Sequence, residues 1–257
     1  MTLTHLLGTK PQGSAGAKMQ TGDVGIRARL RARGAWLVEA GQGPIAEARV
    51  RADLSRAIAD AYPAFEAIRD IALGRGEHRP LRDAALVRLL AAHGLVEERS
   101  GRAVAADAAA RRYLSGGWLE ELVFMAAEAA GADEALVGQR VRWRAGGHEG
   151  ENEIDVLARF VDRLAFFSCK ALAAELERED QAHRKRLMSA LDEADNLMDH
   201  FGGPQDKAAL VVSTDLFAEE ARLVRYEQLH GKAAALRVSL ISLEKLGWTD
   251  LVRAIGA

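Results

Sequence analysis

Hydrophobic positions along the chain follow two periods, one typical of helices and one typical of strands. Between residues 45 and 73 they recur at helical spacing, and the pattern is interrupted just before Pro63. A further helical stripe covers residues 81–93 and ends at Gly94, a residue that favours helix termination. The first part of the chain is therefore expected to contain three helices.

A small hairpin is predicted next, from residues 95–99 and 102–104. Helices followed by a hairpin are the outline of a winged helix, a module that often binds DNA. Only Arg82 and Arg88 are basic in the helix that would read DNA, and Asp83 lies between them. A structural use of this module is therefore favoured over DNA reading.

The second half of the chain alternates between predicted strands and helices. A helix over residues 105–130, with a break at 116–117, precedes alternating residues at 141–144. The remaining expected elements are strands at 152–157 and 164–170, a helix at 171–200, a strand at 208–213, a helix at 216–230, a strand at 236–241 and a helix at 249–255. This order predicts an α/β fold in which helices cover a mixed sheet.

Composition narrows the function classes. The 257 residues are 49% hydrophobic, which is ample for a buried core. The net charge of -2 provides no global positive field for a nucleic acid, so any such contact must use a local patch. A single cysteine, Cys169, excludes an internal disulfide and a cysteine-based zinc site. No apolar run reaches membrane-spanning length and the first twenty residues contain no signal-like segment, so a cytoplasmic protein without a membrane partner is expected.

Charged residues meet on the two predicted strands at 152–157 and 164–170. Because side chains alternate along a strand, Glu153 and Asp155 share one face, and Ser168 and Lys170 share a face of the next strand. A hairpin turn between the strands can bring Asp155 beside both Ser168 and Lys170. This arrangement places a carboxylate, a hydroxyl and an ammonium group at one edge of the sheet.

Phosphodiester hydrolysis is the chemistry that this combination favours. A hard cation such as Mg²⁺ or Mn²⁺, held by carboxylates, neutralises phosphate oxygens and activates water, and a lysine stabilises developing negative charge. Asp155 is the first expected ligand, with Glu120 on the preceding helix as the natural further acid. Glu153 and the backbone carbonyl of Cys169 are additional candidate ligands. The alternative is an ordinary hairpin whose solvent face carries charge.

Basic residues near these strands are candidates for following a phosphate backbone. Arg142 and Arg144 precede the strand that carries Asp155, and Arg184 and Lys185 lie in a basic run on the long helix. Charge runs are more often solvated helix faces, so the first pair is the stronger candidate.

Three segments, 117–120 (GWLE), 152–157 (NEIDVL) and 168–170 (SCK), resemble the nuclease domain of the CARF-linked CRISPR ancillary nucleases of the Card and Can type and their uncharacterised relatives. That domain belongs to the restriction-endonuclease-like PD-(D/E)XK superfamily, and the resemblance covers about residues 80–257. It implies that Asp155 is the metal-binding aspartate, Lys170 the lysine of the (D/E)xK element and Glu120 the helix-borne acid.

The chain departs from the pattern of this family in two places. Ser168 stands where an acid is usual, which removes one negative charge from the expected metal site. The family also senses a cyclic oligoadenylate through an N-terminal Rossmann-like domain, whereas the short region before the winged-helix candidate has a helical pattern. At most residues 34–39 could form a strand of such a domain, so control by a cyclic oligoadenylate is not expected.

The resulting hypothesis divides the chain into a disordered leader (1–22), a helical, winged-helix-like region (23–112) and a PD-(D/E)XK nuclease-like domain (113–257). The expected protein is a Mg²⁺- or Mn²⁺-dependent endonuclease that cleaves DNA or RNA in CRISPR or other anti-phage defence. By resemblance it forms a homodimer through its N-terminal helices. The alternatives are a catalytically inactive nucleic-acid-binding or scaffold protein of the same fold, or a truncated family member that has lost its sensor.

Overall fold

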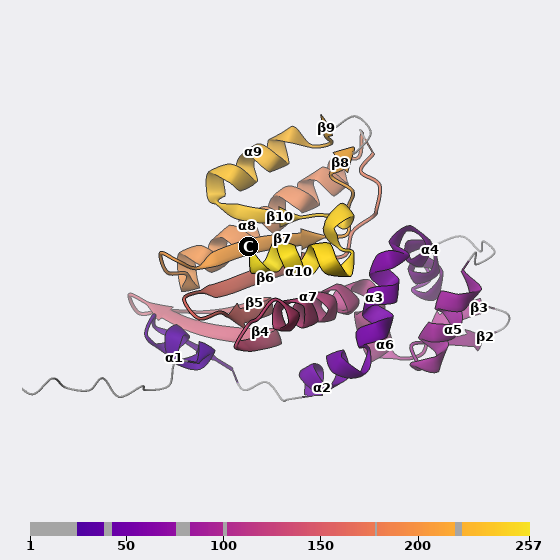
Figure 1. Cartoon of the computed structure of the whole chain (residues 1–257), viewed down its shortest axis with the longest axis horizontal. Helices are drawn as coiled ribbons and strands as arrows, with labels where there is room; N and C mark the ends of the chain where they lie inside the picture. Colours follow the sequence, from indigo (N-terminus) through magenta and orange to yellow (C-terminus); the bar gives the residue numbers. More distant parts are fainter. Residues whose placement is uncertain (1–24, 39–42, 76–82, 100–101, 178, 219–222) are drawn as a thin grey trace, which may run out of the picture.

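The computed structural model of the chain describes residues 25–38, 43–75, 83–99, 102–177, 179–218 and 223–257 (Figure 1). Its centre is a six-stranded sheet with the order β1-β4-β5-β6-β7-β10. The strands are β1 (Ala35–Leu37), β4 (Glu134–Ala145), β5 (His148–Arg159), β6 (Leu164–Lys170), β7 (Lys207–Val212) and β10 (Val238–Ile241). Neighbours from β1 to β6 are antiparallel, whereas β6, β7 and β10 are parallel. The predicted mixed α/β sheet is confirmed.

Helices cover both faces of this sheet, and the strand sequences reflect it. β6 is buried along almost its whole length, which explains its continuous apolar run before Lys170. Side chains of α7 (Trp118–Ala129) and α10 (Trp248–Gly256) pack on one face. Those of α1 (Ile26–Arg31), α8 (Gln181–Phe201) and α9 (Glu227–Leu236) pack on the other.

The helical region before α7 extends the core on the α7 side. Its elements are α2 (Gly43–Val50), α3 (Ala52–Asp60), α4 (Tyr62–Ala72), α5 (Ala84–Ala92), the antiparallel hairpin of β2 (Val96–Arg99) and β3 (Arg102–Ala105), and α6 (Ala108–Arg112). The predicted break before Pro63 and the predicted hairpin are both confirmed, although the segment expected to form two helices forms three. Buried residues of α3 and α4 join those of α7 and of the sheet in one hydrophobic cluster. The helical region and the sheet are therefore one packed unit.

Local breaks in the chain fall where glycine or a capping side chain allows them. The predicted interruption at residues 116–117 is a π-helical turn, Tyr113–Gly117, between α6 and α7. Gly94 ends α5 with a positive φ of 68°, a conformation that favours glycine. Asp107 caps α6 by accepting a hydrogen bond from the amide of Ala110 at 2.7 Å. After this turn, side chains of α7 pack on the central sheet.

Two helix predictions are wrong in part. The helix expected at residues 171–200 begins only at Gln181, because Asp180 caps it and the backbone of the preceding segment bonds to Ser213 and Thr214. The segment expected to form a helix at 216–230 contains two short paired strands, β8 (Phe217–Ala218) and β9 (Leu223–Val224), and its helix starts at Glu227.

The strand considered at residues 34–39 also has a different place from the one expected. Ala35–Leu37 pairs with β4 as an edge strand of the central sheet, so it is not a remnant of a separate sensor domain. The leader expected at residues 1–22 lies outside the described residues, as do residues 219–222 of the segment expected to form a helix at 216–230.

Candidate active site

The candidate site lies where β5 and β6 separate. Their paired register ends at Val156 and Phe167, whereas β6 continues alongside β7 as far as Lys170. Beyond that last pair the amide of Cys169 donates to Oδ2 of Asp155 at 2.7 Å. Since the amide and carbonyl of one strand residue point to the same side, the Cys169 carbonyl also faces the β5 side. The side chain of Asp155 and the backbone of Cys169 therefore lie where the two strands are no longer paired.

Asp155, Ser168 and Lys170 line one pocket of about 200 Å³, as the alternation of the strands predicts. Lys170 Nζ lies 3.9 Å from Asp155 Oδ2 and 2.9 Å from Oε2 of Glu193 on α8. The remaining lining residues are Asn152, Glu153, Asn196 and Leu197. The structure therefore brings the three strand residues together and adds an acid from the facing helix.

Electrostatics in this pocket keep the lysine charged and make the aspartate harder to ionise. Burial raises the pKa of Asp155, although Lys170 and the Cys169 amide oppose the shift. Burial alone would lower the pKa of Lys170, but Asp155 and Glu193 raise it further, so the net shift is upward. A protonated lysine next to a carboxylate is the state in which it stabilises developing negative charge.

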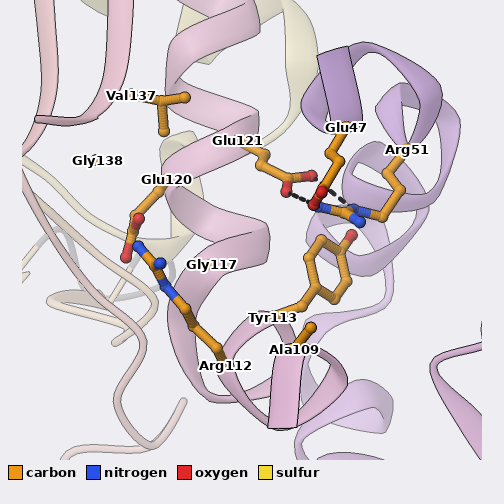
Figure 2. Close-up of a pocket in the computed structure, with 10 residues that line it drawn as sticks. All are labelled: Glu47, Arg51, Ala109, Arg112, Tyr113, Gly117, Glu120, Glu121, Val137 and Gly138. Carbon is orange, nitrogen blue, oxygen red and sulfur yellow. Dashed lines mark hydrogen bonds and ion pairs between the residues drawn. The ribbon is translucent and has the colours of Figure 1, made fainter. Parts of the chain in front are cut away.

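Glu120 reaches the same region from the first turn of α7. Figure 2 shows its carboxylate beside the guanidinium of Arg112, in a second cavity of about 270 Å³ that adjoins Gly138 of β4. Burial, followed by the negative charge of Asp155, raises the pKa of Glu120 to about 7. Glu120 therefore lies within the electrostatic reach of Asp155, although it lines the neighbouring cavity.

The adjacent acid, Glu121, has a structural role. It turns to the opposite side of α7 and pairs with Arg51 of the helical region, whose Nε donates to Glu121 Oε2 at 3.1 Å (Figure 2). Arg51 also pairs with Glu47 at 3.0 Å. Glu121 is therefore engaged by Arg51, whereas Glu120 interacts electrostatically with Asp155 and Arg112.

The available donors fit a hard cation, since two partly buried carboxylates with raised pKa values repel each other and a cation relieves that repulsion. Asp155 and Glu120 would supply these oxygens, with the Cys169 carbonyl as a main-chain donor. Within the described part of the chain, no three His, Cys, Asp or Glu side chains are grouped closely enough to hold a metal. Glu153 instead lies 3.9 Å from Arg112. The cation would thus rely on backbone or solvent oxygens for its other ligands.

The Card1-like endonuclease domain family matches residues 107–237, just over half of the chain. The chain belongs to this family. The matched segment includes Glu120, Asp155, Ser168 and Lys170. It does not include α3 or α4.

Two solved structures share the fold of this Card1-like chain. The protein VC1899 from Vibrio cholerae superposes with a TM-score of 0.62 at 20% identity, covering 90% of this chain and 62% of that protein. Can2 from Sulfobacillus thermosulfidooxidans, solved with cyclic tetra-adenylate, gives 0.58 at 15% identity, covering 91% and 62%. The chain thus spans less than two thirds of either protein. No curated protein matches it.

Three of the four basic residues predicted to bind nucleic acid have acidic or aromatic partners in this Card1-like chain. On the β4–β5 hairpin, Arg142 lies 2.8 Å from Glu151 and Arg144 Nε lies 2.9 Å from Glu149. Arg184 stacks over the ring of Tyr226 at 4.6 Å, whereas Lys185 is exposed. A phosphate backbone would have to compete with the hairpin acids for their arginines.

Sequence patterns missed some residues around this Card1-like site. Glu193 and Asn196 are three residues apart and share one face of α8, and this spacing was the only sequence pattern that linked them. The pairing of Glu193 with Lys170 could not be predicted from it, because that contact depends on long-range packing. Arg112 had no local signal. His183 of α8 is buried and lies 3.0 Å from Thr214 Oγ1. No helix among the described residues is long and apolar enough to cross a membrane.

Proposed function

We propose that this chain is a metal-dependent endonuclease that hydrolyses phosphodiester bonds of DNA or RNA in the cytoplasm. The observation that carries the proposal is the juxtaposition of Asp155, Ser168 and Lys170 in one pocket, with Glu120 near enough for Asp155 to raise its pKa. Membership of the Card1-like endonuclease domain family supports the same activity. The arrangement fits the PD-(D/E)XK type of site.

The residues have distinct roles in the proposed reaction. A bound Mg²⁺ or Mn²⁺ would neutralise a phosphate oxygen and lower the pKa of a water molecule. Asp155 and Glu120 would hold the cation together with the Cys169 carbonyl. Lys170 would stabilise the negative charge that develops on the phosphate or orient the attacking water. Ser168 offers a neutral hydroxyl in the same pocket.

The likeness to Can2, described as bound to cyclic tetra-adenylate, supports a place in CRISPR-linked defence. The proposed partner is a nucleic-acid substrate that Arg142, Arg144, Arg184 and Lys185 contact through phosphates. A homodimer formed through the N-terminal helices remains part of the proposal.

Cation dependence tests the proposed activity directly. Purified protein is expected to cleave at least one of plasmid DNA, single-stranded DNA and RNA with Mn²⁺ or Mg²⁺, and to lose cleavage completely with EDTA. Gel analysis of each substrate, beside an identically purified Asp155→Ala variant, separates this activity from contaminating nucleases. Cleavage that persists in EDTA would refute the metal-dependent reaction.

The rival function is a catalytically inactive nucleic-acid-binding or scaffold protein of the same fold. Ser168 favours this alternative, because a serine supplies no negative charge to a cation beside Asp155. Binding of nucleic acid without cleavage under every cation tested would support the rival and reject the endonuclease.

Restoring an acid at position 168 is expected to strengthen cation binding. Ser168→Glu adds a carboxylate to the pocket of Asp155. The Mn²⁺ concentration that gives the half-maximal cleavage rate or thermal shift should therefore fall about tenfold. The measurement is a Mn²⁺ titration followed by cleavage rate and by thermal shift. Ser189→Glu adds the same charge at an exposed position of α8 and should leave the titration unchanged. Equal titrations for both variants would place the cation away from Ser168.

A further inference from the structure

One side chain of α4 contacts both α7 and the segment that directly follows β6. The fully buried ring of Tyr62 stacks on Trp118, the first residue of α7, with centroids 5.2 Å apart. Its hydroxyl donates a hydrogen bond of 2.5 Å to the carbonyl of Leu172. Trp118 lies two residues before Glu120, and Leu172 lies two residues after Lys170. Tyr62 therefore bridges the helix of the acid and the segment that follows the strand of the lysine.

Further hydrogen bonds hold the Tyr62 hydroxyl in place. It accepts from Arg69 Nη1 at 2.9 Å and from Ser213 Oγ at 2.7 Å. Ser213 Oγ in turn accepts from the amide of Leu172 at 2.8 Å. Burial raises the pKa of Tyr62, which keeps the hydroxyl protonated as a donor. Both the amide and the carbonyl of Leu172 are consequently fixed by one small network.

A second residue of α4 fixes the same segment two residues further on. Glu66 Oε2 accepts a hydrogen bond from the amide of Ala174 at 2.9 Å, while Arg69 Nη2 lies 3.3 Å from Glu66 Oε1. These contacts involve the backbone of residues 171–174, so they do not depend on the apolar side chains there. They also give this segment an alternative to the helix that its sequence pattern predicted.

We infer that Tyr62, supported by Arg69 and Glu66, is a positioning residue that sets the placement of Lys170 relative to Glu120. The inference rests on the proposed nuclease function, and it gives these residues of α4 a part in positioning the site. It adds residues outside the segment of 107–237 that the endonuclease family matches. Tyr62 touches no reacting atom, and its effect would pass through α7 and the end of β6.

Tyr62→Phe keeps the ring on Trp118 and removes only the hydroxyl. The full-length variant is expected to show a kcat lower by about tenfold or more, because small displacements of catalytic groups are costly, with KM changed by less than about twofold. Ser55→Ala is the matched control, since it removes another buried hydroxyl of the helical region, one that bonds Tyr113 at 2.9 Å. An equal fall in kcat in both variants, or none in Tyr62→Phe, would overturn the inference.

Two further readouts separate positioning from general destabilisation. Glu66→Gln keeps an oxygen acceptor for the Ala174 amide and should retain kcat, whereas Glu66→Leu should lower it. Hydrogen exchange of peptides covering residues 171–174 should accelerate in Tyr62→Phe and not in Ser55→Ala.

The exchange measurement also distinguishes failure of the inference from failure of the proposed function. Wild-type protein that never cleaves refutes the nuclease, and with it the catalytic consequence of positioning. Unchanged exchange at residues 171–174 in Tyr62→Phe, with cleavage intact, refutes the positioning role alone.

Discussion

Lys170→Ala is expected to lower kcat about 10³-fold. The positively charged side chain of Lys170 lies in the pocket with Asp155 and Ser168, and its raised pKa keeps it protonated across neutral pH. Its charge would act on negative charge that develops only during the reaction. The dissociation constant for nucleic acid should therefore change by no more than about threefold. Single-turnover cleavage and fluorescence anisotropy measure the two quantities separately.

Lys232→Ala is the matched control for this substitution. Lys232 of α9 also pairs with an acid of α8, Asp192, but it does not line the pocket of Asp155. Its removal should leave kcat close to that of the wild type. A Lys170→Ala protein that retains full kcat would remove Lys170 from the proposed reaction, and a parallel loss in Lys232→Ala would point to a damaged α8.

Glu120 is expected to make both stability and cleavage depend on pH around neutrality. Its pKa in the folded chain is about 7, against a usual value of 4.5, because of burial and Asp155. Since the folded pKa is the higher one, the stabilising contribution is complete below about 4.5 and is lost as pH rises through 7. Without a cation, the free energy of unfolding should fall by about 2 to 3 kcal/mol from this group alone.

Glu120→Gln tests this expectation with a neutral side chain of the same size. In EDTA the variant should be more stable than the wild type above pH 7, and the two should converge near pH 4.5, as followed by denaturant unfolding. Cleavage by the wild type at subsaturating Mn²⁺ should rise with pH through about 7, whereas the variant should lose most activity at every pH. Glu128→Gln, on the same helix but paired with Arg49, should show neither effect. Parallel pH curves for wild type and Glu120→Gln would contradict the raised pKa.

Local pattern was sufficient for the parts of the site that lie on regular strands. Alternation along β5 and β6 placed Asp155, Ser168 and Lys170 together, because strand register follows from which face is apolar. The glycine pair at 116–117 similarly marked the break before α7. These features depend on neighbours in sequence.

Residues held by distant partners could not be predicted in the same way. Residues 171–174 have a helical hydrophobic pattern, but Tyr62, Ser213 and Thr214 bond their backbone and hold them outside a helix. Glu193 meets Lys170 only because α8 crosses the face of β6. Such contacts depend on tertiary packing that overrides local propensity.

The shared core of the helical region and α7 implies that the unit of folding is larger than the unit of sequence similarity. Trp118, Leu122 and Phe124 are completely buried in a cluster that includes Leu54 and Phe65 of α3 and α4. A fragment reduced to residues 107–237 would turn the covered face of α7 into an exposed apolar patch, a surface prone to aggregation. The helical region and the sheet with α7 should consequently unfold together in one cooperative transition.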